Sequence, residues 1–348
     1  YDNLSASAYL RAKEDYLMGI NFSRLLTLKY GNSISNYLGN KYTVVSVGRV
    51  MTCVLGMVVR REREIREFVK TPFYRVIESV NVDGHTFTGE WRAVKGSAYF
   101  ESPKLYKENG FKEKEEAKKL IAVLKEGTSP LTCRIVSIEK KKEKKNPPLL
   151  FNLAELQNEC SKRFKISPDE TLRIVQELYE KKLVTYPRTD ARVLSTAVSK
   201  EITKNLNGLS KYQMAAPYMQ DILHYGVYKN LAKTRYVNDK QITDHYAIIP
   251  TGQGLSALNS VSATAHHVYD VIVRRFLSIF YPPAVYQKVA LVTQIGKEQF
   301  FSNFRVLAEE GYLKVAGVPA PKKNANGNDA EGDGSDNNVD LDAAFFAS

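Results

Sequence analysis

The residues best suited to chemistry lie in one short segment, LVTYPRTDARVLS, from Leu183 to Ser195. A free tyrosine hydroxyl has a pKa of about 10 and is a weak nucleophile unless its surroundings stabilise negative charge. Arg188 follows Tyr186 by two residues, so on an extended segment both side chains leave the same side of the backbone. Its planar guanidinium binds a phosphate through two hydrogen bonds. The pair therefore fits attack of Tyr186 on a phosphate ester to give a covalent phosphotyrosine, although a packed surface pair has the same spacing.

Two predicted helices must position this segment. Asn152 and Glu155 form a capping box before LAELQNECSKRF, and Ser167 with Pro168 and Glu170 begins a second helix that ends at Lys181–Lys182. The apolar positions expected to face the core are Leu153, Leu156, Cys160, Phe164, Leu172, Val175, Leu178 and Tyr179. LVTYP follows as a predicted short strand that carries Tyr186. Helix, tight turn, helix and strand in this order predict a helix-turn-helix with a wing.

The residues before this region predict a helical part and then a β-rich part. The first thirty residues have helical periodicity and are expected to end at Gly31-Asn32-Ser33, and a second helix with a basic side is predicted for 51–68. Asp83-Gly84 joins two predicted strands as a hairpin turn. A helix over 112–125 and a strand LTCRIVSIE follow. The run KKKEKKNPP is interpreted as a solvated linker, with a phosphate contact as the alternative.

After the active-site segment, HHVYDVIVRRFLSIFY predicts an amphipathic helix closed by Pro282-Pro283, and VYQKVALVTQIGKEQFFSNFRVL predicts further strands. The pattern is that of a β-rich domain interrupted by a helical one. From Gly317 onward the composition is that of a linker or disordered tail. The predicted fold class is therefore a multi-domain α+β protein.

Charge points to a polyanionic partner. The chain carries +12, but its last twenty residues hold six acidic and no basic side chains, so residues 1–328 carry +18. Nucleic acid is favoured over a membrane surface, and generic solubility charge is the alternative. Aromatics such as Trp91 and the 21 tyrosines are expected to add stacking on exposed bases where they engage DNA.

The remaining bulk features favour a cytoplasmic protein. No run approaches the roughly 18 apolar residues of a membrane span, and the N-terminus has no basic-then-apolar leader. The chain opens inside a predicted helix, as a fragment would. Cys53, Cys133 and Cys160 show no paired spacing for zinc and are expected to be small core residues in a reducing compartment.

The segment around Tyr186, with the two helices before it, closely resembles the active-site region of type IA DNA topoisomerases, nearest to the bacterial topoisomerase III branch. Further stretches resemble family motifs in the same order: DYLMGINFSR, SVGRVMTCVLG, ITDHYAIIPT and VYDVIVRRFL. The resemblance covers about nine-tenths of the chain. Four positions depart from the usual residue: Tyr16 replaces Trp, Met51 replaces Gln, Cys53 replaces Pro and Ala191 replaces Ser. None of these departures removes a reacting group, although Met51 lacks the polar contacts that a glutamine makes to DNA.

The resemblance implies a reaction and roles for particular residues. Tyr186 would cleave one DNA strand to give a 5′-phosphotyrosyl enzyme and a free 3′-hydroxyl; a second strand would pass and the break would be resealed. Arg188 would steady the phosphate, and His245 would be a hydrogen-bonding partner near it. Arg49 would contact a strand phosphate. Further DNA contacts are expected from Ser46, Lys181, Lys182, Thr189 and Asp190.

The resemblance also implies Mg²⁺, which the family holds in a Toprim domain through a glutamate and an Asp-x-Asp pair. The one D-x-D here, Asp340–Asp342, lies in the predicted disordered tail. We therefore expect a fragment without that domain, with no metal of its own, that binds single-stranded DNA without relaxing plasmid. Underwound or catenated DNA would be the substrate of the full enzyme, a RecQ-type helicase a further partner, the bacterial nucleoid its location and the monomer its state.

The domain boundaries that the resemblance implies are a partial helical base over 1–66, a β-rich arch over 67–148 and 282–316, a helical winged-helix-like domain over 149–281, and a tail over 317–348. Two other function classes share some of these features. A catalytically inactive single-stranded nucleic-acid-binding module would have the same charge. A tyrosine relaxase also forms phosphotyrosine but needs a His-rich metal motif, and His266-His267 is the one His pair in the sequence.

Overall fold

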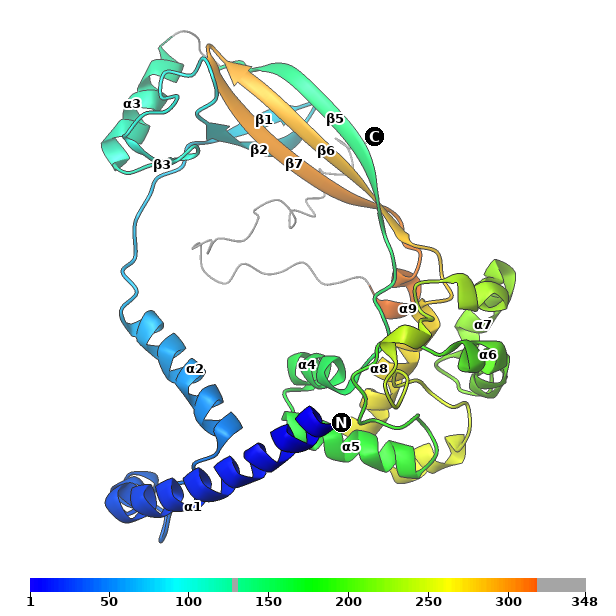
Figure 1. Cartoon of the computed structure of the whole chain (residues 1–348). Helices are drawn as coiled ribbons and strands as arrows, with labels where there is room; N and C mark the ends of the chain where they lie inside the picture. Colours follow the sequence, from blue (N-terminus) through cyan, green and yellow to red (C-terminus); the bar gives the residue numbers. More distant parts are fainter. Residues whose placement is uncertain (127–130, 318–348) are drawn as a thin grey trace. The chain divides into compact units, whose positions relative to one another are not determined.

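The computed structural model describes residues 1–126 and 131–317 (Figure 1). The chain divides into two compact units, one of which is Tyr1–Pro72 while the other begins at Phe73. Helices and antiparallel strands are both present, as predicted for an α+β protein. The predicted tail beyond Gly317, with Asp340 and Asp342, lies outside the described residues.

The first unit contains two helices, α1 (Asp2–Leu38) and α2 (Arg49–Arg66). The predicted end of the first helix at Gly31-Asn32-Ser33 is wrong, because α1 continues for two more turns and closes at Gly39, which has a φ of 69°. α2 matches its prediction within two residues. Cys53 lies on it and is exposed, which corrects the expectation of a core residue; Cys160 is buried and Cys133 is half-buried.

Gly31 is kept inside α1 by a neighbouring extended segment. The Val45 N–H donates to Thr27 Oγ1 (2.9 Å) and the Val47 N–H to Ser23 Oγ (2.8 Å). Two side-chain hydroxyls of α1 thus accept hydrogen bonds from the backbone of the segment 43–47. A Cβ on Gly31 would lie 3.0 Å from the Thr43 carbonyl oxygen. Four residues of a helix advance about 6 Å along its axis, and two residues of an extended chain advance about 6.8 Å. Small residues spaced four apart on α1 can therefore each contact every second residue of the segment 43–47. The glycine serves close packing, which its sequence neighbours did not reveal.

The second unit begins with an antiparallel sheet of order β1-β2-β7-β6-β5. Its strands are β1 (Ile77–Val82), β2 (His85–Arg92), β5 (Arg134–Lys145), β6 (Ala284–Ile295) and β7 (Glu298–Glu309). The predicted Asp83-Gly84 hairpin is confirmed, with both residues at positive φ (50° and 84°) as a type I′ turn requires. The short strands β3 (Leu105–Lys107) and β4 (Gly110–Phe111) precede α3 (Lys114–Lys125), the predicted helix.

The interpretation of KKKEKK as a linker is wrong. Lys140 to Lys145 are the second half of β5, and every one of them pairs with β6, from Lys140 opposite Val289 to Lys145 opposite Ala284. Only Asn146 and the two prolines after it leave the strand. A strand at the edge of a sheet has one solvent-facing side and tolerates a charge density that a central strand would not, so composition alone could not separate it from a linker.

Trp91 anchors the far end of this sheet. Its side chain is fully buried, and its ring stacks on Phe111 with centroids 4.9 Å apart. Its Nε1–H donates to Glu298 Oε2 (2.6 Å), and the same carboxyl accepts from Ser97 Oγ (2.6 Å) and the Ala98 N–H (2.8 Å). Trp91 is therefore a core residue that cannot stack on DNA bases, which corrects the prediction.

Trp91→Phe is expected to lower the free energy of unfolding by about 2–4 kcal/mol. The substitution leaves a void and takes one donor from the buried Glu298 carboxyl, and both effects destabilise. Chemical denaturation of the variant and of the parent chain measures the difference. A change below about 0.5 kcal/mol, the size typical of surface substitutions, would contradict the anchoring role.

The rest of the second unit is helical. Its helices are α4 (Leu153–Phe164), α5 (Pro168–Glu180), α6 (Thr196–Leu209), α7 (Ala216–Tyr225), α8 (Ala263–Ser278) and the short α9 (Leu313–Ala316). Both predicted caps are confirmed: Asn152 Oδ1 accepts from the Glu155 N–H (2.9 Å) and Ser167 Oγ from the Glu170 N–H (3.1 Å). The helices share one hydrophobic cluster, and the sheet has two smaller ones. Among the described residues, no helix is long and apolar enough to cross a membrane.

Candidate active site

The end of α5 directs the chain toward Tyr186. The Lys182 N–H donates to the Tyr179 carbonyl (2.8 Å) and the Leu183 N–H to the Leu178 carbonyl (2.9 Å), which closes the last turn. Lys182 has a φ of 61°, and this left-handed residue turns the backbone out of the helix. The chain then continues through a bend at Leu183 and a bridge at Val184 to Tyr186. The predicted turn from helix to tyrosine is therefore built by backbone hydrogen bonds rather than by the lysine side chains.

The predicted strand LVTYP is wrong in one respect, because a single bridge, Val184 with Pro250, takes the place of a ladder. Pro187 and Pro250 have no N–H group, so regular pairing cannot continue past either of them. Thr185 compensates. Its N–H donates to the Ile249 carbonyl (3.0 Å), its Oγ1 donates to the Ala247 carbonyl (3.1 Å), and the same oxygen accepts from the Ile249 N–H (2.9 Å). These bonds fix the segment of Tyr186 beside the segment of His245.

The Tyr186 ring contacts two other rings. The His245 ring is 4.4 Å away between centroids, tilted by 46°, and the Tyr179 ring is 5.4 Å away at 81°, an edge-to-face contact. Tyr186 itself is half-buried and His245 is exposed. The structure thus brings together two residues predicted for the site, 59 positions apart in sequence. Within the described residues, the Tyr186 hydroxyl has no hydrogen-bond partner, which leaves its oxygen available to a substrate.

Tyr179 is the site residue that the sequence analysis missed. It was assigned to the core face of α5, yet it is 38% exposed and faces Tyr186. The available signal was its place in the last helical turn immediately before the turn to Tyr186. Hydrophobic periodicity alone could not decide between Leu178 and Tyr179. The two residues are adjacent on the helix, so only one of them can point directly into the core.

Thr189 closes the segment on its other side. Its hydroxyl donates to the His245 carbonyl (2.8 Å) and accepts from the Ala191 N–H (3.1 Å), and the residue is buried. The Thr189 carbonyl accepts from the Leu153 N–H (3.2 Å) at the start of α4. The hydroxyl predicted to contact DNA is thus committed to protein partners, and it holds the loop that carries Tyr186 and Arg188 against the His245 segment.

The charged residues around the loop are mostly exposed. Arg188 is exposed and, in the described part of the chain, its guanidinium makes no hydrogen bond or ion pair. Lys182 and Asp190 are exposed as well, and the Asp190 backbone carbonyl accepts from Asn152 Nδ2 (3.1 Å). Lys181 instead donates to Ser260 Oγ (3.3 Å). Arg188 and Tyr186 do not lie on a common strand, so the predicted alternation of side chains along a strand does not place them on one side. Arg188 is accessible to a phosphate because its side chain is exposed.

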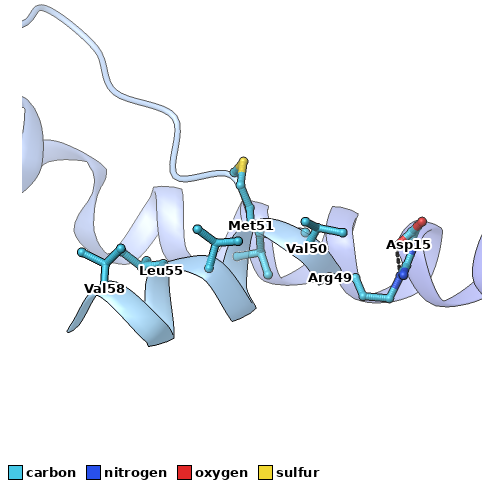
Figure 2. A pocket seen from close by; sticks show the side chains of 9 residues that line it. Asp15, Arg49, Val50, Met51, Leu55 and Val58 are labelled. Atoms are coloured by element: carbon cyan, nitrogen blue, oxygen red, sulfur yellow. Dashed lines mark hydrogen bonds and ion pairs between the residues drawn. The ribbon is translucent and has the colours of Figure 1, made fainter. Parts of the chain in front are cut away.

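Two predicted DNA contacts, Ser46 and Arg49, belong to the first unit. Ser46 is exposed just before α2. Figure 2 shows Arg49 Nε beside Asp15 Oδ1, at 3.3 Å, on the rim of a surface hollow lined by apolar residues of α2, among them Val50, Met51 and Leu55. Both partners of the ion pair are more than 40% exposed, so it contributes little to stability and leaves Arg49 able to exchange Asp15 for a phosphate.

Within the described residues, the Tyr186 site contains a phenol hydroxyl and a guanidinium but no metal-binding constellation. Over residues 1–126 and 131–317, no group of three or more His, Cys, Asp or Glu side chains is placed to hold an ion. The described residues therefore do not fit the Mg²⁺ that the resemblance implies for the whole enzyme. No chemical step that needs Mg²⁺ is assigned to these residues. What they offer is the phenol hydroxyl of Tyr186, an unpaired guanidinium two residues away and an imidazole against the phenol ring.

Comparisons with known proteins identify the family of the chain. A family model described as DNA topoisomerase matches residues 1–341. DNA topoisomerase 3 of Bacillus subtilis (strain 168) is 33% identical over 316 residues, which are 90% of this chain and 39% of that protein; DNA topoisomerase 3 of Bacillus licheniformis gives the same values. The chain thus spans about two fifths of the length of these relatives.

The fold has a counterpart among solved structures. Full-length topoisomerase I from Thermotoga maritima superposes with a TM-score of 0.54 at 24% identity, over 85% of this chain and 45% of that one. At this identity the match shows the fold alone. The chain belongs to the type IA DNA topoisomerase family.

Proposed function

We propose that this chain carries the strand-cleaving site of an enzyme that changes DNA topology by strand passage. The observation that carries the proposal is the Tyr186 ring in contact with both His245 and Tyr179, with Arg188, unpaired within the described residues, two residues further on. Family membership makes DNA the substrate. Relaxation of underwound DNA and separation of catenated DNA belong to the whole enzyme and are part of the proposal.

The proposed step is a transesterification. Tyr186 Oη gives up its proton and forms a bond to a backbone phosphorus of single-stranded DNA. The bond from phosphorus to the 3′ oxygen breaks and that oxygen takes up a proton and leaves as a hydroxyl, so that no proton is gained or lost overall. The product is a 5′-phosphotyrosyl enzyme, and attack by the same 3′-hydroxyl reverses the step. No net bond energy is lost, so no nucleotide cofactor is needed. In this scheme Arg188 binds the non-bridging oxygens, which carry the negative charge, and His245 donates a hydrogen bond nearby.

Tyr179 enters the proposal as a positioning residue. Its ring makes an edge-to-face contact with the Tyr186 ring, which also contacts the His245 ring, and these two contacts restrict how the Tyr186 ring can turn. Edge-to-face contacts are worth about 0.5–1.5 kcal/mol, and a nucleophile that loses its orientation reacts more slowly.

Tyr179→Ala is expected to slow single-turnover cleavage of an oligonucleotide by about 2- to 10-fold, which corresponds to that contact energy. The Kd for the same oligonucleotide should hardly change. Tyr179→Phe keeps the ring and should restore the rate. Equal losses in rate and affinity, or no rescue by Phe, would show that Tyr179 contacts DNA or supports the fold and does not orient Tyr186.

The whole enzyme is proposed to need Mg²⁺ supplied by a Toprim domain, to work as a monomer in the bacterial nucleoid and to cooperate with a RecQ-type helicase. The lengths of the relatives support a larger protein, because they exceed the matched segment by more than twofold. Joining this chain to such a domain should give Mg²⁺-dependent relaxation of negatively supercoiled plasmid.

The 348-residue chain by itself is expected to bind single-stranded DNA and not to relax plasmid. The +18 on residues 1–328 supplies phosphate contacts, so affinity should fall steeply with salt as counterions are released. Filter binding between 50 and 200 mM salt, beside a plasmid relaxation gel, tests both halves. Plasmid relaxed by the chain alone would contradict the dependence on a separate metal domain. DNA binding without any covalent product from the metal-supplemented whole enzyme would favour the alternative, an inactive binding module.

A further inference from the structure

Edge strand β5 presents two chemically different faces. Side chains alternate along a strand, so Lys140, Lys142 and Lys144, here termed the lysine row, share one face. Their cross-strand neighbours on β6 are Val289, Gln287 and Val285, none of them acidic. All three lysines are exposed. The row therefore presents three ammonium groups on one exposed strip.

The opposite face of β5 holds both of the strand's acidic residues. Glu139 pairs with Lys141 (3.0 Å), and Glu143 pairs with Lys288 (3.2 Å) and Arg305 (3.3 Å). Lys141, Lys288 and Arg305 are thus met by carboxylates from the same sheet, whereas Lys145 on that face has no ion pair within the described residues. On the lysine row, Lys142 and Lys144 have no ion pair within the described residues. A run of charges placed only to keep the strand soluble would not need this separation by face.

The spacing of the row suits a single polynucleotide strand. Alternate residues of an antiparallel strand lie about 6.8 Å apart, twice the rise per residue. Phosphates of an extended single strand follow one another at a comparable distance, so the ammonium groups of Lys142 and Lys144, which have no ion pair within the described residues, can meet successive phosphates. Lysine is a point charge on a flexible stem that contacts a phosphate without reading a base. A duplex, whose phosphates curve away along two helical paths, would engage a straight row of three less completely.

The row is continuous with the Tyr186 site through the backbone. β5 ends at Lys145, and five residues later the Leu150 N–H donates to the Arg192 carbonyl (3.2 Å). Between them, the Pro147 carbonyl accepts from the Tyr236 hydroxyl (2.8 Å). The exit of β5 is therefore hydrogen-bonded to the segment that directly follows Tyr186 and Arg188.

We propose that the lysine row is a sequence-independent contact for the backbone of single-stranded DNA, additional to the contacts at Tyr186. The proposal rests on the proposed function only in taking DNA as the polyanion. The competing explanation is protection of an open sheet edge, for which lysine is a common device. Edge protection predicts an effect on self-association and none on DNA.

The test measures binding of a fluorescent oligothymidine to the full chain by anisotropy at several salt concentrations. Lys142→Gln/Lys144→Gln removes two charges from the row, and Lys141→Gln/Lys145→Gln removes two charges from the other face of the same strand. The slope of log K against log salt is about −0.7 for each phosphate contact of a single strand. The first variant should therefore flatten the slope by about 1.4, and the control should change it much less. Lys140→Gln added to the first variant should flatten it further.

Equal changes in the two variants would overturn the proposal, because they would report net charge and not a located contact. A loss seen with a duplex and not with oligothymidine would overturn the single-strand assignment. Self-association of Lys142→Gln/Lys144→Gln at an unchanged slope, seen by light scattering, would establish edge protection instead. Formation of the Tyr186 adduct is scored separately: a flattened slope without any adduct would sink the proposed function and leave the lysine row standing.

Discussion

Tyr186→Phe in the whole enzyme is expected to abolish the covalent protein–DNA complex while leaving DNA binding within about twofold of the parent. The substitution removes one oxygen and keeps the ring, so the contacts with His245 and Tyr179 persist. Without that oxygen no bond to phosphorus can form, and the loss should be complete, not partial. Denaturant quench of a reaction with an end-labelled oligonucleotide, followed by denaturing electrophoresis, detects the complex.

Tyr225→Phe is the matched control, since it removes the hydroxyl of another partly exposed tyrosine, on α7, whose ring contacts lie outside the site. That variant should trap as much covalent complex as the parent. An adduct that survived Tyr186→Phe would show that another residue is the nucleophile. Loss of the adduct in both variants would point to a general effect on folding.

Arg188→Ala is expected to reduce the cleavage rate by a factor on the order of 10² or more, the usual cost of removing one donor that stabilises charge in the transition state. Affinity for single-stranded DNA should weaken much less, because this contact is one among many. The prediction rests on the exposed guanidinium, which has no protein partner in the described residues. Single-turnover cleavage rates and equilibrium binding on the same oligonucleotide separate the two effects.

Arg188→Lys keeps the charge but loses the planar fork, so its rate should lie between those of Ala and the parent. Arg173→Ala is the control: it removes an arginine from the exposed side of α5, where the pairing with Glu170 is loose at 3.8 Å. It should leave the cleavage rate unchanged. If Arg188→Ala weakened binding as strongly as cleavage, Arg188 would be a docking residue.

Local signals in the sequence were sufficient for the elements that carry the site. Asn152 and Ser167 were predicted as helix caps and are caps, because capping is decided within three residues. The Asp83-Gly84 turn was predicted for the same reason. The family was predicted from motif order and is confirmed. The pairing of Tyr186 with His245 came from the motifs and not from any physical signal, since nothing in composition joins residues 59 positions apart.

The errors arose where a distant partner decides the structure. Gly31 remains helical because the backbone of Thr43 approaches it. Lys140 to Lys145 form a strand because β6, more than 130 residues later, supplies the hydrogen bonds. Trp91 is buried against Glu298 and Phe111, and the residues next to Trp91 in the sequence give no sign of these contacts. Tyr179 faces Tyr186 because the turn at Lys182 brings the chain back past α5. Each depends on a tertiary contact, for which local propensity is a weak guide.

The most direct measurement is the identity of the amino acid joined to DNA. The whole enzyme is trapped on a single-stranded oligonucleotide with denaturant, the DNA is trimmed by nuclease, and the protein is digested with trypsin before mass spectrometry. Cleavage after Lys182 and Arg188 releases a peptide of residues 183–188, in which Tyr186 is the one tyrosine. The account predicts a nucleotide linked through its 5′ phosphate to this tyrosine. A nucleotide on any other residue, or a linkage through the 3′ phosphate, would contradict it.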